Sequence, residues 1–367
     1  MERCSHCASE VHRDEICYVG DQPVCRSCAE TETLVCSRCG ERIWETDNCG
    51  DEETVLCSSC YEDHYVRCVR CGRVVPYAAV YYMNEDEDEE NPYCEQCYSE
   101  YKDVIHCYSY KPTPQFYGEG PLYMGVELEA DDGGKSTANA RKLLAVFNRD
   151  CAYGYIKSDG SLDDGLELVT HPCTLSEHQN KVPWEKVLQK FRALGYMSHQ
   201  SRTCGLHVHV NRTAFGRTEQ QQEEKIGHVL YLFERFWQEM LRFSRRTQSQ
   251  VEQWAARYGY KDTAREILEN AKKSYQGRYT CINLTNRNTI EFRIFRGTLK
   301  YNTLIATLQF VERLCSVAIV LSEEELQALS WSDLMLGIQD SQYPELVKYL
   351  KERRLYINEP VTAEGEV

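Results

Sequence analysis

The sequence predicts an α+β fold, in which helices pack against an antiparallel sheet, preceded by small tandem zinc-binding units. Three observations support this prediction. Twelve of the 20 cysteines form six CxxC pairs within the first 107 residues. After residue 121, segments with the alternation of β-strands are interspersed with amphipathic helical segments. Residues 1–107 also hold nine basic and 24 acidic side chains, a balance of −15 that equals the net charge of the whole chain.

The CxxC pairs form three repeats. The opening pairs begin at residues 4, 36 and 68, and 17, 17 and 22 residues separate them from their closing pairs. Each CxxC supplies two thiolates from one tight turn, so two pairs make a tetrahedral zinc site. The spacing resembles treble-clef or LIM-like zinc modules. We therefore expect three structural zinc ions, each held by four cysteines: Cys4, Cys7, Cys25 and Cys28; Cys36, Cys39, Cys57 and Cys60; Cys68, Cys71, Cys94 and Cys97.

A disulfide framework is the alternative for these cysteines. The start MERCSHC has no apolar segment of a secretory signal, which predicts a cytoplasmic location where cysteines stay reduced or bind metal. Cys17 and Cys49 lie at matching places in the first two repeats, where the third has Tyr81. A metal ligand is seldom replaced in this way, so a packing role is favoured for both cysteines.

The zinc module is expected to bind a protein partner or protein substrate. Its acidic balance, together with the run NEDEDEEN at 84–91, provides no basic footprint for phosphate, so nucleic acid is disfavoured. Residues 108–121 contain prolines and glycines without a regular period and are predicted to be a linker. The expected domains are therefore 1–107 and 122–367. No run of 18 apolar residues is present, so no membrane span is expected.

Two segments of the second domain place ionisable side chains on one strand face. In MGVELEA, residues 124–130, Glu127 and Glu129 alternate with apolar residues. In GLHVHV, residues 205–210, His207 and His209 do the same. Alternate residues of a strand share a face, so each pair should point the same way.

Two further segments repeat this pattern. SLDDGLELV, residues 161–169, follows a turn and places Glu167 between two leucines. TIEFRIFR, residues 289–296, puts Glu291 and Arg293 on one face and Arg296 on the other, and TNRN should join it to a strand at 279–284 as a hairpin. Helices are expected at 136–149, 184–194, from Thr218 toward 245, at 302–321 and at 344–353.

The four strands make chemical sense as one sheet around divalent cations. Carboxylates with one imidazole suit Mg²⁺ or Mn²⁺ better than zinc. The alternative is a set of solvated faces, which antiparallel sheets commonly have. Spacing alone leaves both interpretations open. Cys204 stands next to GLHVHV, but its position on the strand points it away from both histidines, so a structural cysteine is favoured over a nucleophile.

The ordered segments GVELE, SDGSL…GLELVTHP, CGLHVHVN and RYTCINL…TIEFRIFRGTL resemble the amidoligase family, over roughly residues 122–310. That family belongs to the carboxylate–amine ligases with a glutamine synthetase-like catalytic fold. The resemblance implies a glutamine synthetase-like antiparallel sheet with packed helices. It also implies an ATP-dependent reaction with Mg²⁺ or Mn²⁺, in which a carboxylate and an amine are joined through an acyl phosphate. The zinc module lies outside the resemblance.

The resemblance also implies roles for individual residues. His209 would lie near the nucleotide phosphates, and Arg293 would stabilise the phosphate in transfer, with Arg296 a less certain partner because of its strand face. The implied magnesium ligands are Glu127, Glu129, Glu167, His207 and Glu291.

Carboxylate and amine substrates, whether small molecules, peptides or proteins, are the implied partners. The sequence contains no GxxxxGK[ST] loop, so a P-loop does not hold the nucleotide. Two other functions remain open at this point. One is a zinc-finger interaction protein with an inactive ligase-like core, and the other is a metal-dependent hydrolase that uses the same carboxylates.

Overall fold

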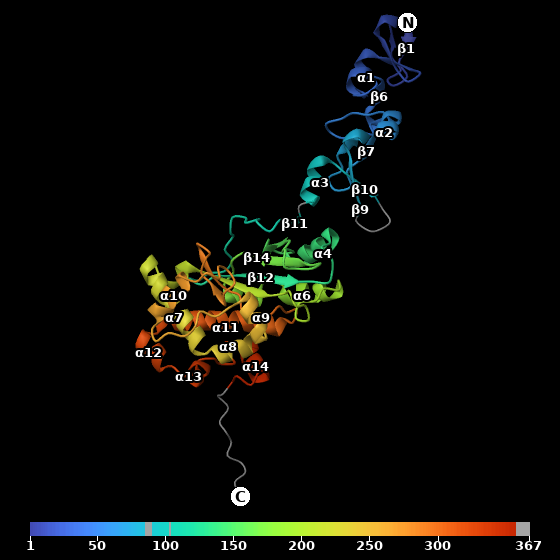
Figure 1. Ribbon diagram of the computed structural model, residues 1–367. Helices are drawn as coiled ribbons and strands as arrows, with labels where there is room; N and C mark the ends of the chain where they lie inside the picture. The colour runs from blue at the N-terminus through green and yellow to red at the C-terminus, as the bar shows by residue number, and fades with distance from the viewer. Residues whose placement is uncertain (85–89, 103, 357–367) are drawn as a thin grey trace. The chain divides into compact units, whose positions relative to one another are not determined.

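The computed structural model describes residues 1–84, 90–102 and 104–356. The chain divides into two compact units, Met1–Asp103 and Val104–Val367 (Figure 1). Residues 85–89 of the predicted acidic run lie outside the described residues.

The first unit consists of pairs of short antiparallel strands with a few short helices between and after them. The paired strands are β1–β2, β3–β4, β5–β6, β7–β8 and β9–β10. The elements are β1 (Glu2–Arg3), β2 (Glu10–Val11), η1 (Arg13–Glu15), β3 (Ile16–Val19), β4 (Gln22–Cys25), α1 (Arg26–Thr31), β5 (Thr33–Val35), β6 (Arg42–Trp44), η2 (Glu45–Asp47), α2 (Ser58–His64), β7 (Tyr65–Arg67), β8 (Val74–Pro76), η3 (Tyr77–Ala79), β9 (Tyr81–Asn84), β10 (Glu90–Tyr93) and α3 (Glu95–Lys102).

The cysteines gather into the three groups of four that the spacing predicts, and each group could hold a zinc ion. Within each group the sulfur atoms lie within 4.8 Å of one another. Backbone N–H groups, led by that of Cys25, lower the pKa of the Cys4 thiol to about 6, which favours the thiolate that zinc binds. Cys17 and Cys49 stand outside the three groups, and Cys17 packs against the apolar cluster of the first repeat.

We expect about three zinc ions per chain, all within residues 1–107, because six CxxC pairs make three Cys4 sites. The apolar clusters of the repeats are small and include the cysteines themselves, so chelation should unfold the repeats. Elemental analysis and far-ultraviolet circular dichroism before and after chelation measure both effects. A zinc-free module, or thiol titration that reveals disulfides, would show that the zinc assignment is wrong.

The second unit is organised around a seven-stranded sheet with the order β11-β13-β14-β12-β15-β17-β16. Every pair is antiparallel except β11–β13, which confirms the predicted α+β class with an antiparallel sheet. The strands are β11 (Ile105–His106), β12 (Met124–Ala130), β13 (Gly154–Lys157), β14 (Leu166–Thr170), β15 (Leu206–Asn211), β16 (Ile282–Asn283) and β17 (Thr289–Phe292).

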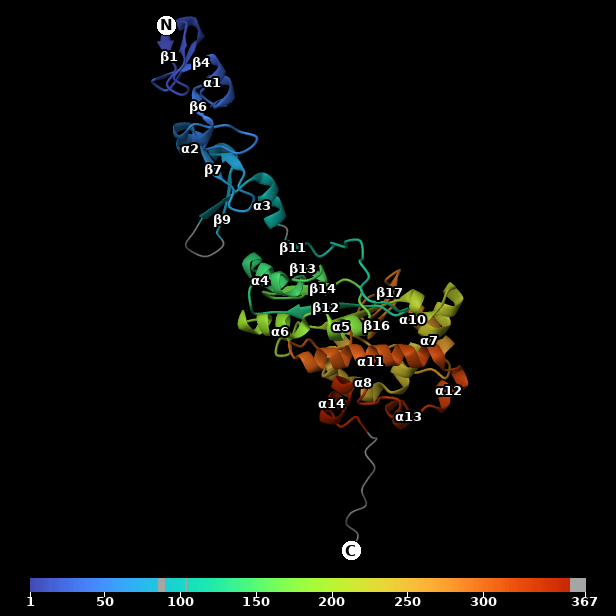
Figure 2. The same cartoon turned by 180° about the vertical axis from the view of Figure 1, so that it is seen from behind.

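Helices cover one face of this sheet. Val126 and Leu128 of β12 are fully buried and belong to one core with the apolar sides of the helices. Figure 2 shows α11 running across the unit below the strands, with α8 beneath it. The helices are α4 (Thr137–Phe147), α5 (Leu175–Asn180), α6 (Trp184–Ala193), η4 (Arg212–Phe215), α7 (Glu219–Arg235), α8 (Trp237–Ser244), α9 (Gln248–Trp254), α10 (Ala264–Lys272), α11 (Tyr301–Val320), α12 (Glu323–Ala328), α13 (Trp331–Leu336) and α14 (Pro344–Glu352).

Two predicted elements are shorter than the sequence pattern suggests. The capping box at Thr218 is confirmed, but the helix that it opens ends at Arg235 and resumes as α8, because Phe236 leaves helical geometry. The strand TIEFRIFR ends at Phe292. Beyond it the backbone N–H of Arg293 still bonds to the carbonyl of Cys281, at 2.9 Å, outside a regular ladder.

Helix α11 is long and apolar enough to span a membrane by length and composition, with a mean hydropathy of 1.6. However, 72% of that apolar window is buried inside the protein. Its apolar residues belong to the same core as the strands, as expected of the central helix of a globular unit.

Residues 104–117 pack against the second unit along their length. β11 pairs in parallel with β13, and the Tyr117 N–H bonds to the carbonyl of Pro172 at 3.0 Å. Tyr108 reaches the principal cavity of the unit, described below. The predicted linker at 108–121 therefore begins as part of the second unit.

A chain that begins at Val104 is expected to fold by itself, whereas a chain that begins at residue 115 should be less stable by about 2 kcal/mol. The shorter chain loses the backbone bonds of β11, each of which contributes roughly 1 kcal/mol. Denaturant titration of both chains measures the difference. An insoluble 104–367 chain would instead mean that the zinc repeats complete the core of the second unit.

Candidate active site

The charged residues predicted from the strand pattern lie on the sheet face opposite the helical core. Strand β12 sets this arrangement, because Glu127 and Glu129 alternate with buried apolar residues. Its register pairs Glu127 with His207 on β15 and Glu129 with Glu167 on β14. On the far side, β17 pairs Glu291 with His209 of β15. Four adjacent strands, β14, β12, β15 and β17, thus bring these six residues to one surface.

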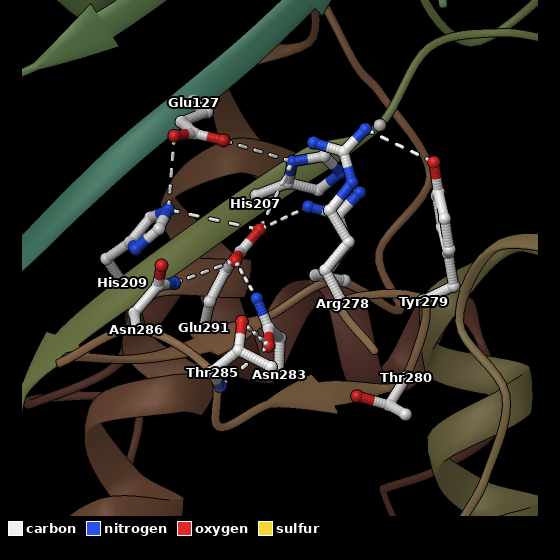
Figure 3. A network of polar contacts seen from close by, with 12 residues as sticks. Glu127, His207, His209, Arg278, Tyr279, Thr280, Asn283, Thr285, Asn286 and Glu291 are labelled. Atoms are coloured by element: carbon white, nitrogen blue, oxygen red, sulfur yellow. Dashed lines mark hydrogen bonds and ion pairs between the residues drawn. The ribbon is translucent and has the colours of Figure 1, made fainter. Parts of the chain in front are cut away.

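Glu127, His207 and Glu291 form the first group that could hold a metal ion, with their ligand atoms within 4.8 Å of one another (Figure 3). His207 Nδ1 lies 3.3 Å from Glu127 Oε2 and 3.7 Å from Glu291 Oε1. His207 and Glu291 are buried, while Glu127 keeps 21% of its side chain exposed. The group therefore combines a buried imidazole with one carboxylate that a ligand can reach.

Glu129, Asp159 and Glu167 form the second such group. Lys157 of β13 stands opposite Glu167, with its Nζ 3.5 Å from Glu167 Oε2. The sequence analysis does not single out Asp159, because the SDGS motif indicates only a turn. What could have pointed to Asp159 is its place as an acidic residue between one strand and the strand that carries Glu167.

Hydrogen bonds hold these ligand groups in place. Asn283 Nδ2 and Asn286 Nδ2 donate to Glu291 Oε2 at 2.8 and 3.1 Å (Figure 3). Arg293 forms an ion pair with the same carboxylate. The Gly205 N–H donates to Glu129. A Cβ at Gly205 would lie 2.5 Å from His207 Nε2, so the glycine of GLHVHV is needed for the imidazole to fit.

The carboxylates are ionised to different degrees. Burial opposes the charge of Glu127, but the charge of His209 and hydrogen bonds from both histidines hold the pKa of Glu127 well below its ordinary value. Burial and the neighbouring charge of Glu127 raise the pKa of Glu167 well above its ordinary value. Burial also raises the pKa of Glu129. Several buried carboxylates this close are costly without positive charge, and a divalent cation at each group would supply it.

The structure separates the two arginines and places His209 inside the cluster. His209 Nε2 lies 3.2 Å from Glu127 Oε1, and its Nδ1 lies 3.2 Å from Thr289 Oγ1. Arg293 lines the cavity above the carboxylates, and its Nε is buried with no hydrogen-bond partner among the described residues. Arg296 is not among the described residues that line the cavity, and its carbonyl accepts a hydrogen bond from Arg245. A catalytic role for Arg296 therefore stays a prediction that the cavity lining does not support.

Arg246 is a further cation at the cavity, and the sequence does not indicate it. Its Nε donates to the carbonyl of Ile294 at 3.1 Å and its Nη2 to that of Phe295 at 3.4 Å. Burial lowers the pKa of Arg246 to about 10, so it remains charged at neutral pH. Only the tertiary packing of the segment after α8 brings it here, which is why no local pattern signals it.

The two groups open into a cavity of ≈510 Å³, within the range of small-molecule sites. Its floor is acidic, while its walls carry cationic, amide and aromatic side chains. Cys204 is buried outside it, and burial raises the pKa of that thiol to about 12, which rules it out as a thiolate nucleophile at neutral pH. The lining residues are Tyr108, Ser109, Lys111, Glu127, Glu129, Lys157, Asp159, Ser161, Glu167, Thr203, His207, His209, Arg246, Trp254, Arg278, Tyr279, Asn283, Thr285, Asn286, Glu291 and Arg293.

Mg²⁺ is expected to raise the melting temperature of the protein more at pH 8 than at pH 6. Burial favours the neutral form of His209, but the charges of Glu127 and Glu291 outweigh burial and raise the pKa of His209 above its ordinary value. The pKa of Glu167 is also raised. Both groups therefore hold protons at the lower pH that must leave before a cation binds their neighbours.

The metal-free protein should show the opposite trend. A raised folded-state pKa contributes stability at low pH that is lost as the pH rises through that pKa. Thermal unfolding in EDTA and in excess Mg²⁺ at pH 6, 7 and 8 measures both trends. A larger Mg²⁺ effect at pH 6 would contradict this description of the cluster.

Comparison with known proteins finds one family that part of the chain resembles. Residues 145–315 match the family described as "Putative amidoligase enzyme". No curated protein matches the chain. Among solved structures, a bifunctional glutathione synthetase from Pasteurella multocida is similar at 15% identity and a TM-score of 0.36, over 64% of this chain and 46% of that chain. A likeness of that extent, which spans less than half of that chain, assigns no activity.

The matched segment includes Glu167, His207, His209, Glu291 and Arg293, and it begins after β12. It confirms the resemblance drawn from the ordered motifs, and the family's description supports a carboxylate–amine ligase as the general class. Residues 145–315, a little under half of the chain, are therefore similar to the amidoligase family.

Proposed function

We propose that this protein is an ATP- and Mg²⁺-dependent carboxylate–amine ligase that forms an amide bond through an acyl phosphate. The observation that supports this most is the pair of neighbouring ligand groups on one sheet face, joined by the alternating carboxylates of β12. Their members are Glu127, His207 and Glu291 in one group and Glu129, Asp159 and Glu167 in the other.

The donor set fits magnesium, or manganese in its place. Five of the six side chains offer carboxylate oxygens, which these hard cations prefer. Among the described residues, the buried Oε2 of Glu167 has an ion-pair contact with Lys157 at 3.5 Å but no hydrogen-bond partner, which leaves it able to bind a cation. When bound there, the cations would neutralise the phosphate oxygens of ATP and orient the terminal phosphate.

The protein's own cations complete the charge balance at the transferring phosphate. Arg293 is held by Glu291, and Arg246 is held by two backbone carbonyls, so both guanidinium groups are fixed before a ligand arrives. Phosphoryl transfer depends mainly on such positioning and charge stabilisation, and it needs no protein nucleophile. His209 links Glu127 to Thr289 and keeps the carboxylate aimed at the cavity.

The proposed reaction has two steps. An oxygen of the substrate carboxylate attacks the γ-phosphorus of ATP, the bond to the bridging oxygen breaks, and ADP leaves. The amine nitrogen then attacks the carbonyl carbon of the acyl phosphate, the bond to the phosphate oxygen breaks, and the amine loses a proton. The products are an amide, ADP and inorganic phosphate, which balances the atoms.

The zinc module is proposed to recruit a protein partner or protein substrate. Its 24 acidic and nine basic side chains favour a basic partner. Recruitment of this kind raises the effective concentration of an acceptor without adding contacts in the active site.

ADP release tests the proposed function. The protein is incubated with ATP, Mg²⁺ and pools of amino acids, peptides and candidate proteins, and ADP is measured against controls without acceptor and with EDTA. We expect ADP to form with at least one pool and to require Mg²⁺. Acceptor hydrolysis without ATP would favour the hydrolase, and binding of a partner with no ADP in any pool would favour an inactive ligase-like core.

A further inference from the structure

Residues 105–111 form part of the active-site wall although they precede the segment that matches the family. β11 adds to the edge of the central sheet beside β13. The rings of His106 and Tyr110 stack at 3.7 Å between centroids, and Tyr110 packs edge-on against Tyr155 at 5.3 Å. These contacts anchor the segment on both sides of Tyr108, so the place of Tyr108 is fixed by its neighbours.

Tyr108 faces the cavity together with aromatic and cationic groups from three other segments. Its hydroxyl contacts the guanidinium of Arg278, whose Cζ lies 5.4 Å from the Tyr108 ring centroid and 5.1 Å from that of Tyr279. The Lys157 ammonium lies 5.1 Å from the Tyr108 centroid. The ring centroids of Trp254 and Tyr279 lie 6.0 Å apart. A row of planar side chains, which runs from Tyr108 through Arg278 and Tyr279 to Trp254, thus lines one part of the cavity wall.

The rings of Tyr108 and Tyr279 are more exposed than aromatic side chains in a protein core. Tyr108 is 49% exposed and Tyr279 is 39% exposed, although both line the cavity. Aromatic rings that stay partly exposed in a concave site are surfaces against which a flat ligand group can pack. Arg278 adds a planar cation of the kind that stacks on rings and bases.

We propose that Tyr108, Arg278 and Tyr279 form the subsite for the nucleotide base, and that residues 105–111 are therefore a substrate-binding element. This inference rests on the proposed use of ATP. The phosphates belong near the carboxylate groups, Arg246 and Arg293, which leaves the aromatic wall with Arg278 for the base. A base has two flat faces that can stack on aromatic rings and on a guanidinium plane, and stacking of this kind is a common mode of base recognition.

The test compares two probes that both carry a chain of three phosphate groups, of which only one is attached to a nucleoside. One is the Mg²⁺ complex of the non-hydrolysable ATP analogue AMP-PNP, and the other is the Mg²⁺ complex of inorganic tripolyphosphate. Calorimetric titration of the full chain gives the Kd of each. Tyr108→Ala should raise the Kd of Mg·AMP-PNP about tenfold, within the range measured for removal of a stacked ring. It should change the Kd of Mg·tripolyphosphate less than about twofold, whereas Tyr108→Phe should restore most of the AMP-PNP affinity.

Phe116→Ala is the matched control. Phe116 lies shortly after this segment in the chain and is 58% exposed, but it packs on Tyr123 and is not among the described residues that line the cavity. It should leave both Kd values unchanged. Equal weakening of both probes by Tyr108→Ala would mean that Tyr108 acts through Arg278 on the phosphates, and it would overturn the base subsite. An unchanged AMP-PNP affinity would also overturn it. Failure of the wild-type chain to bind either probe would instead refute the proposed function.

Discussion

Glu127→Gln and Glu291→Gln are each expected to lower ATP turnover by at least about 10³-fold while leaving the protein folded. The amide keeps the shape of the side chain but removes the charge that a divalent cation binds. A loss of this size corresponds to about 4 kcal/mol of transition-state stabilisation. Both residues belong to the group centred on His207, and both contact the imidazole of His209.

The control for this prediction is Glu234→Gln. Glu234 is a buried carboxylate that accepts hydrogen bonds from Arg257 at 2.7 and 2.8 Å, and it does not line the cavity. Its replacement should lower the free energy of unfolding and leave turnover nearly unchanged. Turnover and thermal unfolding, the latter with and without Mg²⁺, separate the two effects. Normal turnover in Glu127→Gln would rule out the proposed metal site.

Arg246→Gln is expected to lower kcat by about 10²- to 10³-fold, which is the usual cost of removing a fixed donor aimed at developing charge. Arg246→Lys should recover little of this loss, because an ammonium cannot reproduce the planar fork of the guanidinium. The KM for ATP should change much less than kcat, since the interaction strengthens in the transition state.

Arg245→Gln provides a neighbouring control. Arg245 also donates to a backbone carbonyl of the same segment, that of Gly297 at 3.3 Å, but it lies outside the catalytic cavity. Its replacement should destabilise the protein to a similar extent and leave kcat within about threefold of wild type. A similar fall in kcat for both variants would assign Arg246 a purely structural role.

Local patterns in the sequence identify most of the carboxylate site because strand alternation places side chains directly. Glu127, Glu129, His207 and Glu291 were placed on one face by a period of two, and the register of β12, β15 and β17 brings them together. The same rule points Arg296 away from Arg293, whereas the family resemblance makes Arg296 a candidate for the site. Arg296 is not among the described residues that line the cavity, and its role in catalysis stays a prediction.

Residues that reach the site through tertiary packing left no such signal. Arg246 follows a helix, and Tyr108 lies in a segment whose prolines and glycines indicated a linker. Asp159 sits in a turn, where an acidic residue is common without any function. The break at Phe236 was likewise invisible, because the apolar stripe continues through it and only the dihedral angles change.

The most direct test of the ligase proposal follows the oxygen atoms of the carboxylate substrate. The protein is incubated with ATP, Mg²⁺, an amine pool and a pool of amino acids and peptides whose carboxylates carry ¹⁸O, and the inorganic phosphate is analysed by mass spectrometry. An acyl phosphate transfers one carboxylate oxygen to each phosphate released, so phosphate with a single ¹⁸O is predicted, in amounts equal to ADP. Phosphate that carries oxygen from water alone would contradict the account, because ATP would then be hydrolysed without activating a carboxylate.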